Sequence, residues 1–391
     1  GDFEMNTHVT EKNCIGCLAR ENICPQKAIT HGIGSGFIRP IIDESTCVNC
    51  GLCLKVCPKS GALGKSLFLQ QAYAVKHTDI NVLRSSTSGG AFSAIADYII
   101  RESGTVYGCV LKDGTVQHIR TENEYCSMRG SKYVQSDLKN IYSEIAHDLS
   151  NGRKVLFTGT PCQCNSVKKY LTLKKIQSAD LILVDFICHG TTSPALFGDY
   201  ISYYEKKKNK EIADHLFRSK INGWTKHTEM NILSDGTKDY QSYESQLFKS
   251  IFYSHLGMNE GCFKCGYTST NRISDITLAD FWGVKKQHPD LFDESGVSFV
   301  LINSNKGQNV FDNCKNIEKQ LVSITDTDQP SLHSPAVIPQ QYNAFWADYH
   351  KKGFDYIVKK QPCQAARLIK SHDEYNRARV AEYQKMAAEK E

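Results

Sequence analysis

A cysteine pattern that occurs twice near the start of the chain constrains its fold more than any other feature. Four positions recur at an offset of 33 residues: Cys14, Cys17, Cys24 and Pro25 return as Cys47, Cys50, Cys57 and Pro58. The chain has 391 residues, 16 of them cysteine, and no segment that resembles a signal peptide. Disulfide frameworks belong to short secreted domains, whereas Cys-x-x-Cys spacings before proline in a long chain are typical of metal clusters. We therefore expect iron–sulfur clusters and a cytoplasmic location.

The second copy has the complete spacing of a bacterial ferredoxin motif. In such motifs three cysteines, each separated from the next by two other residues, hold one 4Fe–4S cluster. The fourth cysteine, before proline, is a ligand of the other cluster. The expected ligands of one cluster are Cys47, Cys50, Cys53 and Cys24. Structural zinc is the alternative, but zinc motifs rarely repeat with this crossed spacing.

The first copy lacks one ligand. The offset places Arg20 opposite Cys53, so the second site has only Cys14, Cys17 and Cys57. Three thiolates can hold a 3Fe–4S cluster, or a 4Fe–4S cluster with one ligand that is not cysteine. A guanidinium is a poor ligand because it stays protonated. An empty, degenerate half-site is the third interpretation.

The length predicts more than one domain, with a mixed α/β (α+β) fold after the module. We expect a ferredoxin-like module at 5–60, a linker at 61–78, the main α/β domain at 79–330 and a helical extension at 331–391. A strand from Lys154, a helix over 163–175 and a strand from Asp180 predict a βαβ unit with functional loops at the carboxyl ends of its strands. Asp113-Gly114 predicts a hairpin turn.

Charge and hydropathy exclude two classes of partner. The net charge is +5, and no run of lysine and arginine lies beside interleaved aromatic residues, so nucleic acid is not expected. No apolar stretch reaches the roughly 18–20 residues that a membrane span needs.

Five cysteines of the main domain lie after predicted strands or between glycines: Cys162, Cys164, Cys188, Cys262 and Cys265. Two strand ends could meet the Cys-x-x-Cys motif to form a four-thiolate site, and inert core thiols are the alternative. His189, beside Cys188, is a candidate acid–base residue, although a histidine there more often supports a ligand. Asp275 and Asp280 could be paired acids or capping residues of a strand.

A Ser88-Gly89-Gly90 turn at a predicted helix start is the best candidate cradle for a cofactor phosphate. Small residues let backbone N–H groups approach an anion, and the helix dipole favours negative charge. The nearby segment Ser131-Lys132-Tyr133 adds a cation and an aromatic ring. A simple helix cap is the alternative.

Taken in order, these motifs resemble the coenzyme F420 hydrogenase/dehydrogenase beta-subunit family, over about residues 10–305. The motifs are Thr87–Ala91, Gly130–Val134, Gly159–Gln163, Cys188–Gly190, Phe217–Trp224, Cys262–Cys265 and Ser274–Gly283. The resemblance implies a flavin, FAD with FMN as the alternative, bound by Thr87, Ser88, Gly89, Gly90, Ser131, Lys132, Tyr133, Thr160 and Pro161. It also implies a 4Fe–4S cluster on Cys162, Cys188, Cys262 and Cys265. If one of these four is not a ligand, we expect Cys164 to replace it.

We therefore expect an iron–sulfur flavoprotein oxidoreductase with two to three clusters. Clusters carry single electrons and a flavin accepts one or two, so the pair joins ferredoxin-type clusters to a two-electron substrate. The candidate catalytic residues are His189, Lys132 and Arg218. Arg218, Lys220 and Trp224 are expected to form a pocket wall, and a basic loop with a buried tryptophan is the alternative. The expected partners are a redox protein or ferredoxin and a small-molecule substrate, and the chain could form oligomers. The alternatives are a non-catalytic electron-relay subunit and a zinc-stapled interaction protein.

Overall fold

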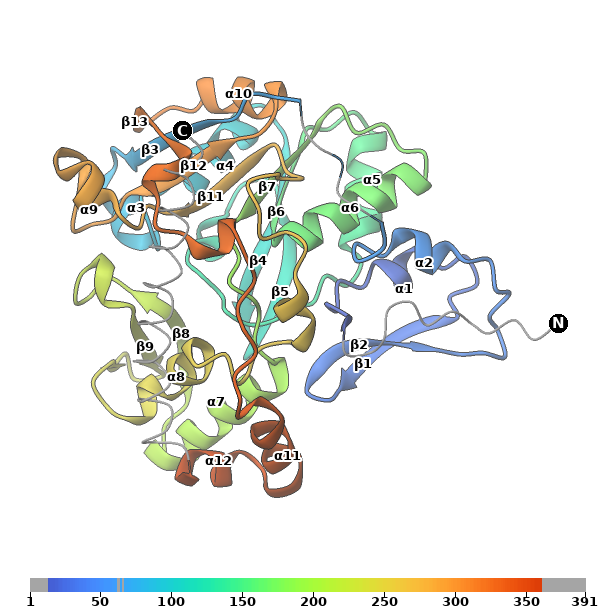
Figure 1. Ribbon diagram of the computed structural model, residues 1–391, viewed down its shortest axis with the longest axis vertical. Coiled ribbons are helices and arrows are strands. Elements are labelled where there is room, and N and C mark those ends of the chain that lie inside the picture. The colour runs from blue at the N-terminus through green and yellow to red at the C-terminus, as the bar shows by residue number, and fades with distance from the viewer. Residues whose placement is uncertain (1–12, 62–63, 65–66, 361–391) are drawn as a thin grey trace.

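The computed structural model describes residues 13–61, 64 and 67–360, and consists of a small N-terminal module beside a large mixed α/β domain (Figure 1). This confirms the predicted fold class. The outermost segments of the expected domains, 5–12 and 361–391, lie outside the described residues.

The module repeats in structure as it does in sequence. It contains α1 (Ala19–Ile23), the antiparallel hairpin of β1 (Ile29–Gly34) and β2 (Phe37–Ile42), and α2 (Leu52–Val56). Each short helix follows a residue with left-handed backbone, Leu18 or Gly51, and ends at a cysteine, Cys24 or Cys57. The two cysteines that precede the prolines therefore occupy equivalent places in the two halves.

The main domain is built on an eight-stranded sheet in the order β13-β3-β12-β11-β7-β6-β4-β5. The strands are β3 (Gln71–His77), β4 (Thr105–Lys112), β5 (Thr115–Thr121), β6 (Val155–Gly159), β7 (Leu181–Phe186), β11 (Ile276–Asp280), β12 (Ser298–Ile302) and β13 (Ile317–Val322). Strands β4, β6, β7 and β11 run parallel, and the other neighbouring pairs are antiparallel. Four carboxyl ends thus meet at one edge of the sheet.

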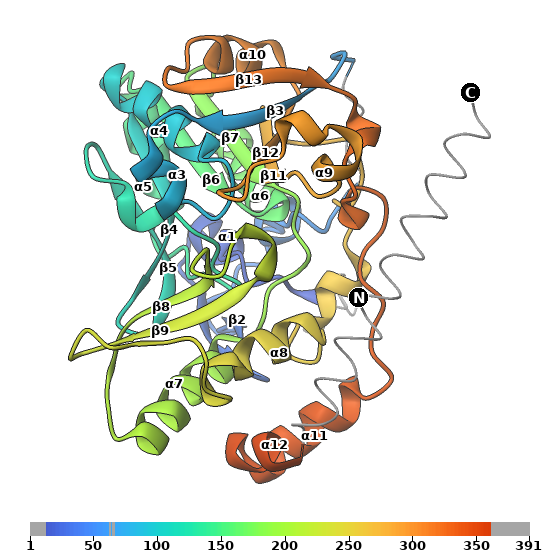
Figure 2. The ribbon, with the colours of Figure 1, turned by 90° about the vertical axis from the view of Figure 1, so that its left-hand side faces the viewer.

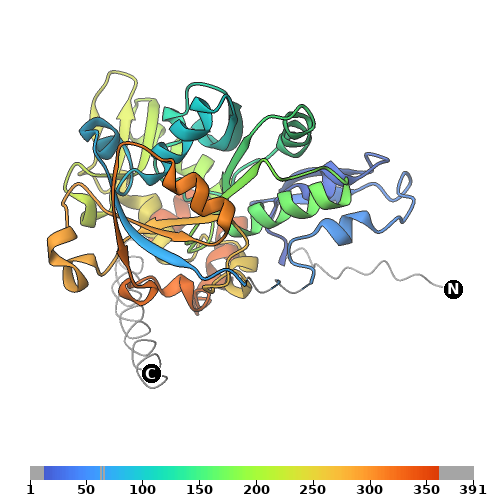
Figure 3. The same cartoon turned by 90° about the horizontal axis from the view of Figure 1, so that it is seen from above.

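Side chains of successive residues in the central strands point to opposite faces of the sheet and pack into two separate hydrophobic cores. Leu156 and Ile182 pack with α4 (Ala91–Arg101) and α10 (Asn305–Asp312) on one face. Phe157 and Leu183 pack on the other face with α5 (Ile141–Ser150), α6 (Pro161–Leu173) and the module. Figure 3 shows the blue module beside this second face. The predicted βαβ unit is β6-α6-β7, and the predicted turn at Asp113-Gly114 joins β4 to β5.

The prediction of a linker at 61–78 is wrong for residues 71–77, because they form strand β3 between β12 and β13. The buried side chains on its inner face include Ala72 and Ala74, whose small size gives little apolar signal. Pairing with two neighbouring strands, and not the sequence pattern, makes this segment a strand.

A second layer of structure lies below the sheet (Figure 2). It contains the small sheet of β8 (Ile212–Ser219), β9 (Thr228–Leu233) and β10 (Lys238–Asp239), with α7 (Pro194–Lys208), α8 (Leu247–Tyr253), α11 (Tyr342–Lys352) and α12 (Phe354–Lys360). Two short helices, α3 (Ile80–Ser85) and α9 (Val284–Gln287), flank the upper sheet. Among the described residues, no helix has both the length and the apolar character that crossing a membrane requires.

Candidate functional site

The predicted motifs of the main domain gather at the carboxyl ends of its parallel strands. Thr160 and Cys162 follow β6, Cys188 follows β7, and Trp282 follows β11. Since neighbouring parallel strands end at the same edge of a sheet, loops that are far apart in sequence meet there.

The four cysteines implied by the family resemblance are electrostatic neighbours. Burial raises the pKa of the Cys162 thiol well above its ordinary value, and the charges of Cys265, Cys188 and Cys262 raise it further. The pKa of Cys188 is raised by burial, then by Cys262 and Cys265. We call these four residues the thiol quartet. A cluster that accepts four thiolate charges offsets the cost that burial otherwise imposes on them.

Hydrogen bonds orient three sulfurs of the quartet. The hydroxyl of Thr160 lies 3.1 Å from Cys162 Sγ, and the backbone N–H of Gly190 donates to Cys188 Sγ at 3.4 Å. The N–H of Tyr267 donates to Cys265 Sγ, also at 3.4 Å. Bonds of this kind to ligand sulfurs are one of the ways in which proteins set cluster potentials. The residues present therefore fit a 4Fe–4S cluster.

Within the described residues, no three cysteine, histidine or acidic side chains converge as a single metal ion would require. A cubane places each thiolate on a different iron, so its ligands spread more widely than those of one ion.

The structure places Cys164 away from the quartet. Its sulfur is fully buried and lies 3.7 Å from the carbonyl oxygen of Val184. Burial raises its pKa, and the charged groups that act on it most are Asp185 and Arg272, not the other cysteines. Cys164 is a core thiol in this arrangement.

A buried cation holds the two cluster loops together. The guanidinium of Arg272 pairs with Asp185 at 2.9 Å and donates to the carbonyl oxygens of Phe186 and Tyr267. Phe186 precedes Cys188, and Tyr267 follows Cys265, so one side chain ties both loops. Sequence reasoning missed Arg272 because its contacts are with backbone carbonyl oxygens of two loops, which no local motif records.

The incomplete half-site of the module is the more buried of its two sites. Burial, with the charges of Cys14 and Cys57, raises the pKa of Cys17 to about 12. Arg20 and these three cysteines line one pocket. Nη2 of Arg20 is buried and has no hydrogen-bond partner among the described residues.

The complete site of the module lies outward. Cys50 is exposed, and Cys24, Cys47 and Cys53 are half-buried. Burial raises the pKa of Cys53, and the positive charge of Arg20 opposes that rise. Arg20 therefore acts on both sites of the module.

The Thr87–Gly90 turn meets two other predicted segments. The Thr87 hydroxyl accepts from the Ser131 N–H at 2.8 Å, and the Ser88 carbonyl accepts from Lys220 Nζ at 2.6 Å. A side chain at Gly89 would collide with the backbone of Val75 in β3. Close packing on the sheet thus requires this glycine whether or not an anion binds.

Lys132 and Tyr133 form the next part of the same region. Nζ of Lys132 donates to the carbonyl oxygens of Ser127 (3.0 Å) and Arg129 (2.6 Å), and burial lowers its pKa. The ring of Tyr133 stacks on Phe252 with 4.1 Å between centroids. Thr160 and Pro161, by contrast, lie at the start of α6 beside Cys162, next to the quartet.

Asp280 joins the expected pocket wall. It forms an ion pair with Arg218 and accepts from Trp224 Nε1 at 2.7 Å. The Arg218 guanidinium lies 4.9 Å from the ring centroid of Trp282, which stacks on Trp224. Lys220 belongs to the Ser88 turn instead, where three carbonyl oxygens surround it and burial lowers its pKa to about 8.

The two aspartates proposed as paired acids lie at opposite ends of β11. Asp275 precedes the strand, accepts from the N–H of Leu183 at 2.9 Å and pairs with Lys306 at 3.4 Å. The structure therefore gives them separate structural roles.

His189 lies near a second histidine that the sequence did not single out. Its Nε2 lies 3.2 Å from Gln329 Oε1, and its charge contributes to lowering the pKa of His227. Burial and Arg218 hold the pKa of His227 at about 3, so this ring is neutral. His227 stacks on Trp282 and bonds to the hydroxyl of Tyr253. An aromatic region that contains the Arg218–Asp280 ion pair thus adjoins the quartet.

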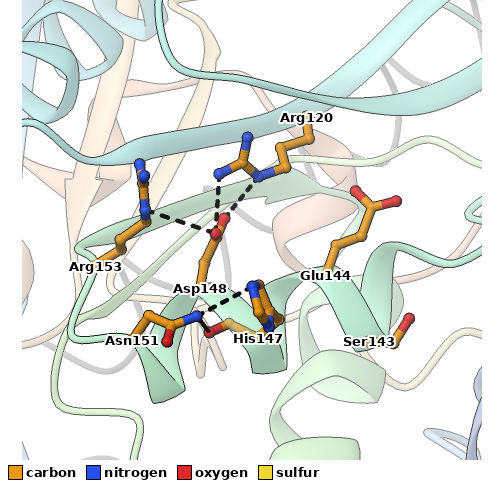
Figure 4. Close-up of a pocket in the computed structure, with 7 residues that line it drawn as sticks. All are labelled: Arg120, Ser143, Glu144, His147, Asp148, Asn151 and Arg153. Atoms are coloured by element: carbon orange, nitrogen blue, oxygen red, sulfur yellow. Dashed lines mark hydrogen bonds and ion pairs between the residues drawn. The ribbon is translucent and has the colours of Figure 1, made fainter.

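A surface cleft lies elsewhere, between β5 and α5 (Figure 4). It is lined by Arg120, Ser143, Glu144, His147, Asp148, Asn151 and Arg153. Its arginines are paired with Asp148 and Glu122, so it offers little net charge to a ligand. None of the predicted site residues lines it.

Two parts of the chain match known families. Residues 152–329 match the family described as the C terminus of the beta subunit of coenzyme F420 hydrogenase/dehydrogenase. Residues 13–61 match a 4Fe-4S dicluster domain. The first match includes the thiol quartet and the second all cysteines of the module, which confirms the resemblance seen in the sequence.

Individual relatives are more distant. The F420-dependent formate dehydrogenase subunit beta of Methanocaldococcus jannaschii is 21% identical over 248 residues, which cover 62% of this chain and 58% of that protein. An uncharacterized protein in the rpl9-rpl11 intergenic region of Porphyra purpurea is 41% identical over 61 residues, covering 15% of this chain and 80% of the relative. Among solved structures, a chain of the F420-reducing NiFe hydrogenase complex from Methanosarcina barkeri is similar, with 19% identity and a TM-score of 0.44 over 82% of this chain and 93% of that chain.

Proposed function

Because residues 152–329 match the C terminus of the coenzyme F420 hydrogenase/dehydrogenase beta subunit and residues 13–61 match a 4Fe-4S dicluster domain, we propose that the chain is an iron–sulfur flavoprotein oxidoreductase of this family. It passes electrons between the ferredoxin-type module and a two-electron substrate bound in the main domain. The observation that supports the proposal is the arrangement of the three cysteine segments. Cys162 and Cys188 follow the neighbouring parallel strands β6 and β7, and Arg272 bonds to the backbone beside both Cys188 and Cys265, at the sheet edge where ligands bind in open α/β folds.

The residues of this chain have separate tasks in the proposal. Cys162, Cys188, Cys262 and Cys265 hold one 4Fe–4S cluster, and Cys24, Cys47, Cys50 and Cys53 hold another. Cys14, Cys17 and Cys57 hold a third cluster beside Arg20. The described cysteines are all free thiols, as cluster ligands in a reducing cytoplasm must be.

A flavin, FAD or FMN, would convert single electrons into a two-electron transfer. The residues that would bind it are the Thr87–Gly90 turn, Ser131, Lys132 and Tyr133, with Thr160 and Pro161 on the side of the quartet. Thr87 contacts Ser131, and Lys220 contacts Ser88, so two of these segments and the expected substrate wall form one region. Arg218 is paired with Asp280 and lies beside Trp282, so the expected substrate wall is aromatic and its positive charge is balanced by a carboxylate.

The partner would dock where a cluster comes nearest the surface. Cys50 is exposed, and its neighbour Val48 has 60% of its surface accessible. A redox protein or ferredoxin that contacts this end of the module would exchange electrons with the outer site.

Flavin binding is tested by measuring the flavin content of the purified protein and of one variant. Protein purified without air and then denatured should release a flavin. Lys132→Ala should retain less of it, because a charge-assisted hydrogen bond contributes about 1.5–3 kcal/mol. Lys139→Ala, which removes an exposed lysine bonded to Gln117, should retain the wild-type amount. If no flavin is released and none can be reconstituted, the chain is an electron-relay subunit and not an oxidoreductase with its own substrate.

A further inference from the structure

The module docks on the main domain through its incomplete half. Gly16 and Asn49 are equivalent in the repeat and both have left-handed backbone. A side chain at Gly16 would collide with Gln135 and with the backbone of Ile38, whereas Asn49 lies in the exposed half. The half that carries Cys14, Cys17 and Cys57 therefore faces the main domain, and the half that carries Cys50 faces away.

One residue connects the inner half-site to the thiol quartet directly. The hydroxyl of Tyr267 donates to the carbonyl oxygen of Pro58 at 2.6 Å, and Pro58 follows Cys57. The backbone N–H of the same Tyr267 donates to Cys265 Sγ at 3.4 Å. Asn165 Nδ2 donates to the Tyr267 hydroxyl at 2.7 Å and fixes its position. A short path of covalent and hydrogen bonds thus runs from Cys57 to Cys265.

The surroundings of Tyr267 agree with this placement. Burial raises the pKa of its hydroxyl, and the charges of Cys162, Cys265 and Cys17 raise it further. Thiols of both sites therefore act on this ring.

We propose that Tyr267 is the electron link between the half-site of the module and the thiol quartet, so that electrons pass the outer site, the half-site and the quartet in that order. This inference rests on the proposed function. A cluster held by Cys14, Cys17 and Cys57 would be oxidised by one electron, and a cluster held by the quartet would be reduced by that electron. No covalent bond forms or breaks, and no proton moves. Flow in the opposite direction uses the same link.

A matched pair of variants in the full chain tests the link. Tyr267→Phe removes the hydroxyl that reaches Pro58. Tyr142→Phe is the comparison variant, because the buried Tyr142 hydroxyl also donates to a half-site carbonyl, that of Cys17, at 2.5 Å, and bonds with Ser166 at 2.7 Å. The backbone of Tyr142 belongs to α5, whereas the backbone N–H of Tyr267 donates to the quartet sulfur of Cys265. Both variants lose one buried hydrogen bond between module and main domain.

The readouts are iron and sulfide per chain, the midpoint potential of each cluster, and freeze-quenched paramagnetic resonance spectra after rapid mixing with a reduced ferredoxin. We expect both variants to keep the wild-type iron content and potentials. In Tyr267→Phe the quartet cluster should be reduced several-fold more slowly than in Tyr142→Phe, while the outer site is reduced at the same rate. Equal rates in the two variants would overturn the proposal.

Loss of quartet iron from Tyr267→Phe alone would also overturn it, because the hydroxyl would then hold the site and not carry electrons. A wild-type protein without iron would instead contradict the proposed function itself.

Discussion

Arg20 makes the two halves of the module chemically different. It stands where the repeat expects a fourth thiolate, it lines the same pocket as Cys14, Cys17 and Cys57, and its Nη2 is buried without a partner among the described residues. A buried positive charge favours the reduced form of a neighbouring cluster. We predict a 3Fe–4S cluster here, with a potential raised by the guanidinium.

Replacing the arginine tests this prediction. The oxidised wild-type protein should show the paramagnetic resonance signal of a 3Fe–4S cluster. Arg20→Cys should abolish this signal and add about one iron per chain by completing a cubane. Arg20→Lys keeps the charge without a thiolate and should keep the signal. If the wild-type spectrum is empty and the iron count is about eight, the half-site holds no cluster.

His227 should make stability depend on pH. Its pKa is about 3 in the folded chain and about 6.5 when the chain is unfolded. Between these values only the unfolded state binds the proton, so the free energy of unfolding should fall as pH drops from 6.5 towards 3. His227→Gln should show a shallower fall in melting temperature over this range. The exposed histidine variant His147→Gln should follow the wild-type slope, and an equal slope in both variants would contradict the assignment.

The helices, strands and turns that the sequence predicted correctly are those that a short run of residues defines. The Asp113-Gly114 turn and the β6-α6-β7 unit are present as expected. The positions of the cysteines after predicted strands indicated candidate loops, and the choice of the four quartet residues came from the family resemblance. Strand β3 was missed because its buried face contains two alanines and only its neighbours define it. Tyr267 and Arg272 were missed because each acts through backbone groups of distant loops, which no local motif records.

Helix α6 offers a test of how an element positions the quartet. Gln163 Oε1 accepts from the Thr160 N–H at 2.9 Å, and Gln163 Nε2 donates to the Ser136 hydroxyl at 2.9 Å. Gln163→Ala leaves both groups unsatisfied next to Cys162 and should cost about 1–3 kcal/mol of unfolding free energy. Denaturant unfolding measures the cost. Gln177→Ala, in the exposed loop after α6, should cost nothing measurable, and an equal effect of both changes would show that the cap does not hold this loop.

At the scale of the whole molecule, three groups of thiols extend from an exposed end of the module to the ligand-binding edge of the main sheet. The outer group contains the exposed Cys50, the half-site is packed against the main domain, and the quartet adjoins the aromatic region around the Arg218–Asp280 ion pair. Such an arrangement suits a protein that accepts single electrons at one end and delivers pairs at the other.

The most direct test of this account is the metal and flavin content of the full chain purified without air. We predict a brown protein with about eleven or twelve iron atoms per chain, a similar amount of acid-labile sulfide, and one flavin. Cys262→Ser should lower the iron count by about four and leave the clusters of the module in place. A colourless protein that contains zinc and no sulfide would contradict the central claim, because the thiols would then be structural.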